Sequence, residues 1–173
     1  SRLAKKEVTV ALTGDGGVEL FQGYGAYVWA NRLNNPLFRI VKGPLRAGLL
    51  LSGKSRTRRV AHMLDSIEPG QQRSHIFSQE QYLFTQHEVR DQVLVDPANF
   101  KSFAYNDSII RDDKRTAGEK QAIFDLHYYL KDDLLVKVDR ASMYSALECR
   151  SPLLDHRVVE FAFSIDHTLK IRD

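Results

Sequence analysis

Apolar residues recur at helical spacing over most of the chain, and a single short stretch near the start has the pattern of a strand. Residues 8–12 (VTVAL) are mostly apolar and rich in β-branched side chains. This length and composition are typical of a buried strand in a parallel sheet. No later stretch predicts a strand. A single strand cannot form a sheet, so its partners are expected to come from outside this chain.

The rest of the pattern predicts helices separated by glycine, proline and charged breaks. Two Thr/Ser-x-x-Glu/Gln pairs and one aspartate have the form of helix N-caps. The expected helical regions are 19–32, 37–51 with an interruption at Gly43-Pro44, 78–85 beginning at Ser78, a helix beginning at Thr116, another opened by Asp132 and Asp133, and 158–165 capped by Asp155. The predicted fold class is therefore mostly α with one short β-strand.

A glycine-rich turn, Thr13-Gly14-Asp15-Gly16-Gly17, joins the predicted strand to the first helix. Strand, glycine turn and helix start together present backbone N–H groups to a phosphate, although a tight turn without a ligand is the simpler alternative. The glycine spacing matches neither a Walker loop nor the dinucleotide fingerprint. Because bare carboxylates repel phosphate, Asp15 and Glu19 beside such a turn suggest a bridging divalent cation.

Composition narrows the class of protein and its surroundings. Hydrophobic residues are 43% and charged residues 27% of the 173 positions, as in soluble globular proteins. The single cysteine, Cys149, excludes a disulfide framework and favours a reducing, cytoplasmic compartment. No apolar run approaches the roughly 18 to 20 residues needed to cross a bilayer, so no membrane partner is expected.

Basic residues gather between Leu20 and Leu64, where no acidic residue occurs. Such a cluster can mark a nucleic-acid footprint, or it can be a solvated helical face that pairs with the acidic remainder of the chain. The net charge of only +3, together with the absence of a nucleic-acid-binding motif, favours the solvated face. No nucleic-acid partner is predicted.

Two stretches together resemble a known family. Residues 8–24 (VTVALTGDGGVELFQGY) resemble TGDGGDELFGGY, and residues 135–155 (LVKVDRASMYSALECRSPLLD) resemble LxKVDRxSMxxSLExRxPFLD; both are signatures of the synthetase domain of glutamine-dependent asparagine synthetases. The resemblance implies that 1–173 is an internal part of an α/β adenine-nucleotide α-hydrolase-like (ATP-pyrophosphatase) domain. The family's glutaminase with its nucleophilic cysteine, its SGGxDS pyrophosphate loop and its C-terminal lysine segment are absent.

The resemblance also implies a chemistry. ATP, with Mg²⁺, adenylates aspartate, and ammonia from glutamine then attacks the adenylate. Asp15 occupies the acidic position that accepts a proton from ammonia, while Glu19 is a candidate for the metal shell or a structural carboxylate. The nucleotide and pyrophosphate would lie against Thr13, Gly14, Gly16 and Gly17. The chain by itself is expected to be inactive, and a homodimer is one assembly to be considered.

Five charged residues form the framework of the second motif: Lys137, Asp139, Arg140, Glu148 and Arg150. Their density predicts buried ion pairs that anchor a helix to a loop. The alternative is that Lys137 or Arg140 touches phosphate.

Two positions depart from the family pattern. Val18 stands where the family has a cation-binding aspartate, and Gln22 stands where it has glycine. An aliphatic side chain at position 18 should weaken binding of magnesium pyrophosphate. Two alternatives therefore stay open: a related amidotransferase or cyclase that acts on another carboxylate, and a degenerate domain with a role in assembly.

Overall fold

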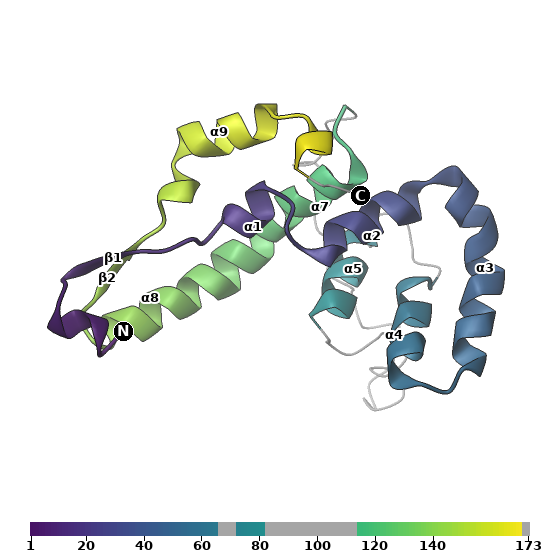
Figure 1. Cartoon of the computed structure of the whole chain (residues 1–173), viewed down its shortest axis with the longest axis horizontal. Helices are drawn as coiled ribbons and strands as arrows, with labels where there is room; N and C mark the ends of the chain where they lie inside the picture. The colour runs from purple at the N-terminus through teal and green to yellow at the C-terminus, as the bar shows by residue number, and fades with distance from the viewer. Residues whose placement is uncertain (66–71, 82–113, 171–173) are drawn as a thin grey trace, which may run out of the picture. The chain divides into compact units, whose positions relative to one another are not determined.

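The structure is a computed structural model that describes residues 1–65, 72–81 and 114–170 (Figure 1). The chain divides into two compact units, one made of Ser1–Tyr24 with Glu119–Asp173 and the other of Gly25–Gly118. The described residues are mostly helical, as the sequence predicts. The predicted helix end at Thr85 lies outside the described residues.

The first unit contains a parallel pair of strands from opposite ends of the chain. Strand β1 (Val10–Leu12) pairs with β2 (Glu148–Arg150), with Ala11 opposite Cys149. Figure 1 shows the two strands side by side. The prediction of a strand without a partner in this chain is therefore wrong. Because β2 carries charged residues at both ends, its sequence lacks the apolar run that is typical of a buried strand.

The two faces of this small sheet differ. Val10 and Leu12 share one face with their register partners Glu148 and Arg150. On this face Leu12 is 72% exposed, and both charged partners are exposed. Cys149, on the other face, is half-buried, and the helix that precedes β2 packs against that strand. One face of the sheet is thus left open by the described residues.

That preceding helix is the last part of a continuous helical run. It consists of α7 (Ala117–Asp125), the π-helical segment η4 (Leu126–Leu134) and α8 (Leu135–Met143). The predicted start near Thr116 is confirmed. The predicted new helix at Asp132 and Asp133 is wrong, because both lie inside η4. Their carboxylates are exposed and lie 3.4 Å from Lys131 and Lys137 respectively, so they do not interrupt the helix.

The first unit is completed by the short elements η1 (Ala4–Lys6), α1 (Gly17–Leu20), η5 (Pro152–Leu154), α9 (His156–Ser164) and η6 (His167–Leu169). Asp155 is the N-cap of α9, as predicted, and accepts a hydrogen bond of 2.9 Å from the backbone N–H of Arg157. Helix α9 packs against α1 and η5. The two signature motifs therefore share one packed region.

The second unit contains α2 (Gly25–Asn34), α3 (Pro36–Leu51), α4 (Ser55–Met63) and α5 (Gln72–Glu80). Its buried apolar side chains are Ala26, Tyr27, Ala30, Leu33, Ala61, Met63, Leu64 and Ile76. The predicted single helix over 19–32 is instead α1 and α2, separated by Gln22 with a backbone φ of 58°. A positive φ is incompatible with a continuing right-handed helix.

Helix α3 runs through Pro44 without the predicted interruption. Asn35 caps it by accepting a hydrogen bond of 2.9 Å from the N–H of Leu37. The helix buries no residue, and Leu37, Ile40 and Leu51 are 74%, 75% and 88% exposed.

The predicted cap at Ser78 is also wrong. Ser78 lies inside α5, where its hydroxyl donates to the carbonyl of His75 at 2.9 Å. No helix in the described part of the chain has both the length and the apolar character needed to cross a membrane.

Candidate functional site

The two motifs meet where β1 and β2 end. In a parallel sheet the carboxyl ends of neighbouring strands lie at the same edge, which is where α/β sheets bind ligands. Thr13 follows β1 and Ser151 follows β2, and their hydroxyl oxygens are 2.9 Å apart. The backbone N–H of Thr13 also donates to the carbonyl of Arg150 at 2.8 Å. The structure therefore brings Thr13, a sequence-predicted nucleotide residue, to the edge where a ligand is expected.

Beyond Thr13 the glycine turn packs on the second motif. Gly16 has a φ of 88°, and a Cβ added there would lie 2.9 Å from Leu154 Cγ. A Cβ at Gly17 would lie 2.8 Å from Leu153 Cδ1. Both distances are below those of real Cβ contacts. Gly16 is required by its positive φ as well as by its contact with Leu154, whereas at Gly17 the Leu153 side chain would have to move. Contact of Gly16 and Gly17 with a nucleotide stays a prediction.

Gly14 differs from the two glycines that follow it. It is exposed, and a Cβ added there would meet no atom within 4 Å. Among the described residues, the space on the Cβ side of Gly14 is therefore open, beside Thr13 at the carboxyl edge of the sheet. Among the turn glycines, Gly14 is the one whose surroundings leave room for a phosphate or a ribose.

Asp15 lies between the open and the packed parts of the turn. The residue is half-buried, and its Oδ2 atom is shielded from solvent without a hydrogen-bond partner among the described residues. An aspartate in an Asx turn would instead accept a hydrogen bond from a nearby backbone N–H. The unpartnered oxygen leaves Asp15 able to accept a proton or a hydrogen bond from a ligand.

Glu19 points into the protein and not to the surface. It is 1% exposed, its Oε1 has no hydrogen-bond partner among the described residues, and its carboxyl hydrogen-bonds the side chain of Tyr24. Burial raises the pKa of Glu19 above its usual value, and nearby Asp15 raises it further. Burial and the neighbouring Glu19 also raise the pKa of Tyr24. This setting resembles that of a structural carboxylate, although the role of Glu19 toward a metal stays a prediction.

The two departures from the family pattern differ in their surroundings. Val18 is 40% exposed, and its Cγ1 lies 2.9 Å from where a Cβ of Gly23 would stand. Gln22 is only 5% exposed, and neither polar atom of its amide has a partner among the described residues. Position 22 therefore carries both a left-handed backbone and a buried unsatisfied amide, whereas the family's glycine would avoid both.

The predicted buried ion pairs of the second motif are not present. Lys137 pairs with Asp133 at 3.4 Å and Arg150 pairs with Glu148 at 2.7 Å, and all four side chains are more than half exposed. The first pair lies within the continuous helical run of η4 and α8 and the second lies within β2, so neither anchors a helix to a loop as expected. Asp139 and Arg140, also on α8, are exposed. Helix α8 lies against β2, and Leu147, in the connection between them, is 3% exposed.

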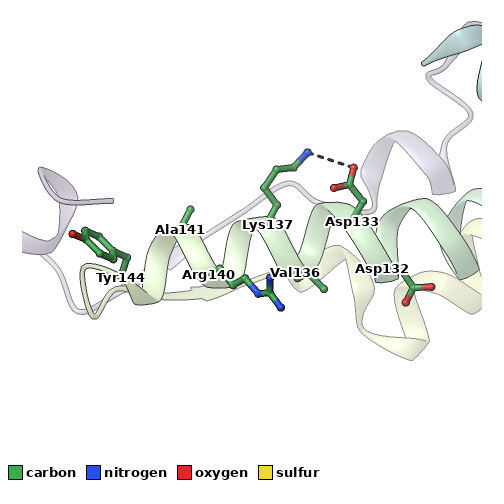
Figure 2. Close-up of a pocket in the computed structure, with 7 residues that line it drawn as sticks. All are labelled: Asp132, Asp133, Val136, Lys137, Arg140, Ala141 and Tyr144. Carbon is green, nitrogen blue, oxygen red and sulfur yellow. Dashed lines mark hydrogen bonds and ion pairs between the residues drawn. The ribbon is translucent and has the colours of Figure 1, made fainter. Parts of the chain in front are cut away.

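An open hollow follows the outer side of η4 and α8 (Figure 2). It is lined by Asp132, Asp133, Val136, Lys137, Arg140, Ala141 and Tyr144. Figure 2 shows Lys137 reaching toward Asp133 on one side of the helix, with Arg140 extending on the other. Because the lining comes from one helical run and the residue after it, the described part of the chain supplies no second wall to enclose a ligand.

The described residues contain no group of three or more His, Cys, Asp or Glu side chains that could hold a metal ion. Val18 offers no ligand atom and Glu19 is buried. Mg²⁺ is commonly held by one or two carboxylates together with substrate phosphates, so a magnesium site at Asp15 and Glu19 stays a prediction.

Sequence reasoning missed three residues that complete this region: Ser151, Leu153 and Leu154. They directly follow β2, and Pro152, which disfavours a helical conformation at Ser151, was the available signal. The missed strand explains the omission, because without β2 nothing brings positions 151–154 beside the glycine turn.

Comparison with known proteins identifies a family that matches this chain. The family model described as asparagine synthase matches residues 1–173. Asparagine synthetase [glutamine-hydrolyzing] 1 of Bacillus subtilis (strain 168) is 32% identical, covering 98% of this chain and 27% of the relative. A putative asparagine synthetase [glutamine-hydrolyzing] of Mycobacterium bovis is 30% identical, covering 99% of this chain and 26% of the relative. The chain thus spans about a quarter of these relatives. No solved structure matches significantly.

Proposed function

Because the chain belongs to the asparagine synthase family, we propose that it is part of a domain that uses ATP to convert the side-chain carboxylate of aspartate into an amide. In the first step a carboxylate oxygen attacks the α-phosphorus of ATP, and pyrophosphate leaves. In the second step the nitrogen of ammonia attacks the acyl carbon, AMP leaves, and one proton goes to a base. The ammonia would come from glutamine, hydrolysed in another part of the parent protein.

The observation that carries this proposal is the meeting of both motifs at the carboxyl edge of the sheet. Thr13 and Gly14 face the side where a nucleotide would lie, with a hydroxyl and an open backbone as hydrogen-bonding groups. The packing of Gly16 and Gly17 on η5 would hold this part of the turn in shape. Preorganised donors of this kind stabilise the charge that develops on phosphate oxygens.

Asp15 is the proposed base of the second step. Its Oδ2 is shielded from water and has no hydrogen-bond partner among the described residues. A carboxylate in this state can take the proton that the attacking nitrogen loses. Because no proton is released from ammonia in the first step, the role assigned to Asp15 concerns amidation alone.

Magnesium enters the proposal as part of the substrate MgATP. Glu19, beside Asp15, is kept as a candidate for the magnesium shell, since Mg²⁺ is commonly held by one or two carboxylates together with substrate phosphates. We also expect the 173-residue chain alone to form no asparagine. A homodimeric parent and a cytoplasmic location complete the proposal.

A second candidate is a domain that has kept its fold for assembly and lost its chemistry. Val18, at the position of a family aspartate, and the strained, buried Gln22 favour this alternative. It predicts that neither adenylation nor nucleotide binding survives in the parent.

The test is aspartate-dependent exchange between ATP and pyrophosphate in the full parent protein, together with binding of MgATP. Exchange with aspartate supports the proposal. Binding without exchange would point to another carboxylate, and loss of both would favour the assembly domain. The variant Asp15→Asn should keep exchange but lose amide formation, whereas the matched control Asp132→Asn, at an exposed position of η4, should change neither. Loss of exchange in Asp15→Asn would contradict the role proposed for Asp15.

A further inference from the structure

We propose that Ser151 is a positioning residue of the nucleotide site and acts through the hydroxyl of Thr13. The inference rests on the proposed function, and it extends that function to a residue with no assigned role. It starts from a single contact, the 2.9 Å separation between Thr13 Oγ1 and Ser151 Oγ. The contact joins residues that follow two different strands and belong to two different motifs.

The place of this pair makes the contact relevant to a ligand. Thr13 and Ser151 are the first residues beyond the carboxyl ends of β1 and β2, since the strands end at Leu12 and Arg150. Ligands of parallel sheets bind at this edge. Both side chains are half-buried, so the hydroxyls are held by protein and still border open space. Gly14 follows directly, and a Cβ added there would meet no described atom within 4 Å.

The backbone around both residues fixes the geometry. The N–H of Thr13 donates to the Arg150 carbonyl at 2.8 Å, and the Ser151 carbonyl accepts from the N–H of Leu154 at 3.0 Å. Ser151 has φ −111° and ψ 84°, outside the helical region, which is disfavoured for a residue before a proline. The Ser151 hydroxyl is therefore carried on a rigid connection between β2 and η5.

The contact has a direction because each hydroxyl has one proton to donate. When Ser151 donates to Thr13, the Thr13 proton is left for another acceptor, such as a phosphate or ribose oxygen of the nucleotide. The Arg150 carbonyl, 3.5 Å from Thr13 Oγ1, is a competing acceptor for this proton with or without Ser151, and it already accepts from the Thr13 N–H. A hydrogen bond accepted from Ser151 polarises the Thr13 hydroxyl and makes it a stronger donor. Ser151 thus prepares the Thr13 hydroxyl to donate to the ligand.

The test compares three substitutions in the full parent protein. Ser151→Val and Ser151→Thr form a matched pair, because they differ only by a methyl group in place of a hydroxyl, and Ser151→Ala serves as a smaller variant should the valine protein fail to fold. Loss of one hydrogen bond of this kind predicts an MgATP dissociation constant about three- to tenfold higher in the valine and alanine variants. Ser151→Thr should bind as the unsubstituted protein does. The KM for ATP should rise in parallel, with kcat changed less than about twofold.

A double-mutant cycle checks that the effect passes through Thr13. In a Thr13→Val background, which removes the hydroxyl that Ser151 orients, Ser151→Ala should weaken binding no further. Additive losses would overturn the inference and assign Ser151 a direct contact instead.

The remaining outcomes separate this inference from the proposed function. Unchanged binding in Ser151→Ala, or binding by Ser151→Thr as weak as that of Ser151→Val, overturns the role of Ser151 while the proposed function stands. Failure of the unsubstituted parent to bind MgATP overturns the proposed function, and the inference falls with it.

Discussion

Gly16 provides the sharpest test of how the two motifs pack together. The substitution Gly16→Ala puts a Cβ on a residue with a φ of 88°, where a side chain costs about 1–2 kcal/mol. The same Cβ would overlap the side chain of Leu154, lying 2.9 Å from its Cγ, and crowding of this kind costs about 1–3 kcal/mol. The variant should therefore lose about 2–5 kcal/mol of the free energy of unfolding.

The assay is urea denaturation of the 173-residue chain followed by circular dichroism, with Gly14→Ala as the matched control. Gly14 lies in the same turn, but its φ is not in the left-handed region and a Cβ there meets nothing within 4 Å. The control should change the free energy of unfolding by less than about 0.5 kcal/mol. Equal losses in the two variants, or a loss below about 1 kcal/mol for Gly16→Ala, would refute the packing described here.

A second background divides the loss into its two causes. In a Leu154→Ala chain the side chain that would collide with the new Cβ is removed, while the backbone conformation of Gly16 still disfavours alanine. Gly16→Ala should then cost only about 1–2 kcal/mol. If the cost is the same in both backgrounds, the glycine is required by its backbone alone and not by contact with η5.

Three further predictions concern other parts of the chain. Gln22→Gly should raise the free energy of unfolding by about 1 kcal/mol, because it relieves a φ of 58° and removes a buried amide without partners among the described residues; a loss in urea denaturation would contradict this. Burial lowers the pKa of His75 from 6.5, so the unfolded chain binds that proton more readily and stability should fall as the pH drops below 6.5; denaturation between about pH 5 and 8 should show a shallower fall in His75→Gln. Lys137→Ala should cost less than about 0.5 kcal/mol, since its ion pair with Asp133 is exposed, and a larger loss would restore the expectation of a buried pair.

The sequence predicted those elements whose signals are local. Asp155 caps α9 through its own side chain, and the start of α7 follows from a capping pattern within a few residues. Such signals act over one helical turn, so they do not depend on the rest of the fold. The glycine turn was likewise predictable, because three glycines in five positions favour a tight turn over a helix or a strand.

The missed features depend on contacts between distant parts of the chain. Strand β2 has the sequence Glu148-Cys149-Arg150, which becomes a strand because it pairs with β1 in parallel and α8 packs against it. Pro44 was expected to break a helix, yet α3 continues through it. Ser78 has the form of a cap, but the helix around it begins earlier. Local propensity was overridden in each of these elements, as is common where tertiary packing decides.

The same distinction applies to the candidate site. The first motif alone predicted that its glycines contact a phosphate. In the structure the glycines differ: Gly16 and Gly17 pack against Leu154 and Leu153, whereas a Cβ at Gly14 would meet no described atom within 4 Å. The first motif therefore does not act only in ligand binding. Part of it packs against η5, which belongs to the second motif. Because Thr13 and Ser151 meet where this packed region ends, a change in either motif should be felt at the same edge of the sheet. The shape of the glycine turn therefore depends on its packing against η5 and not on a ligand alone.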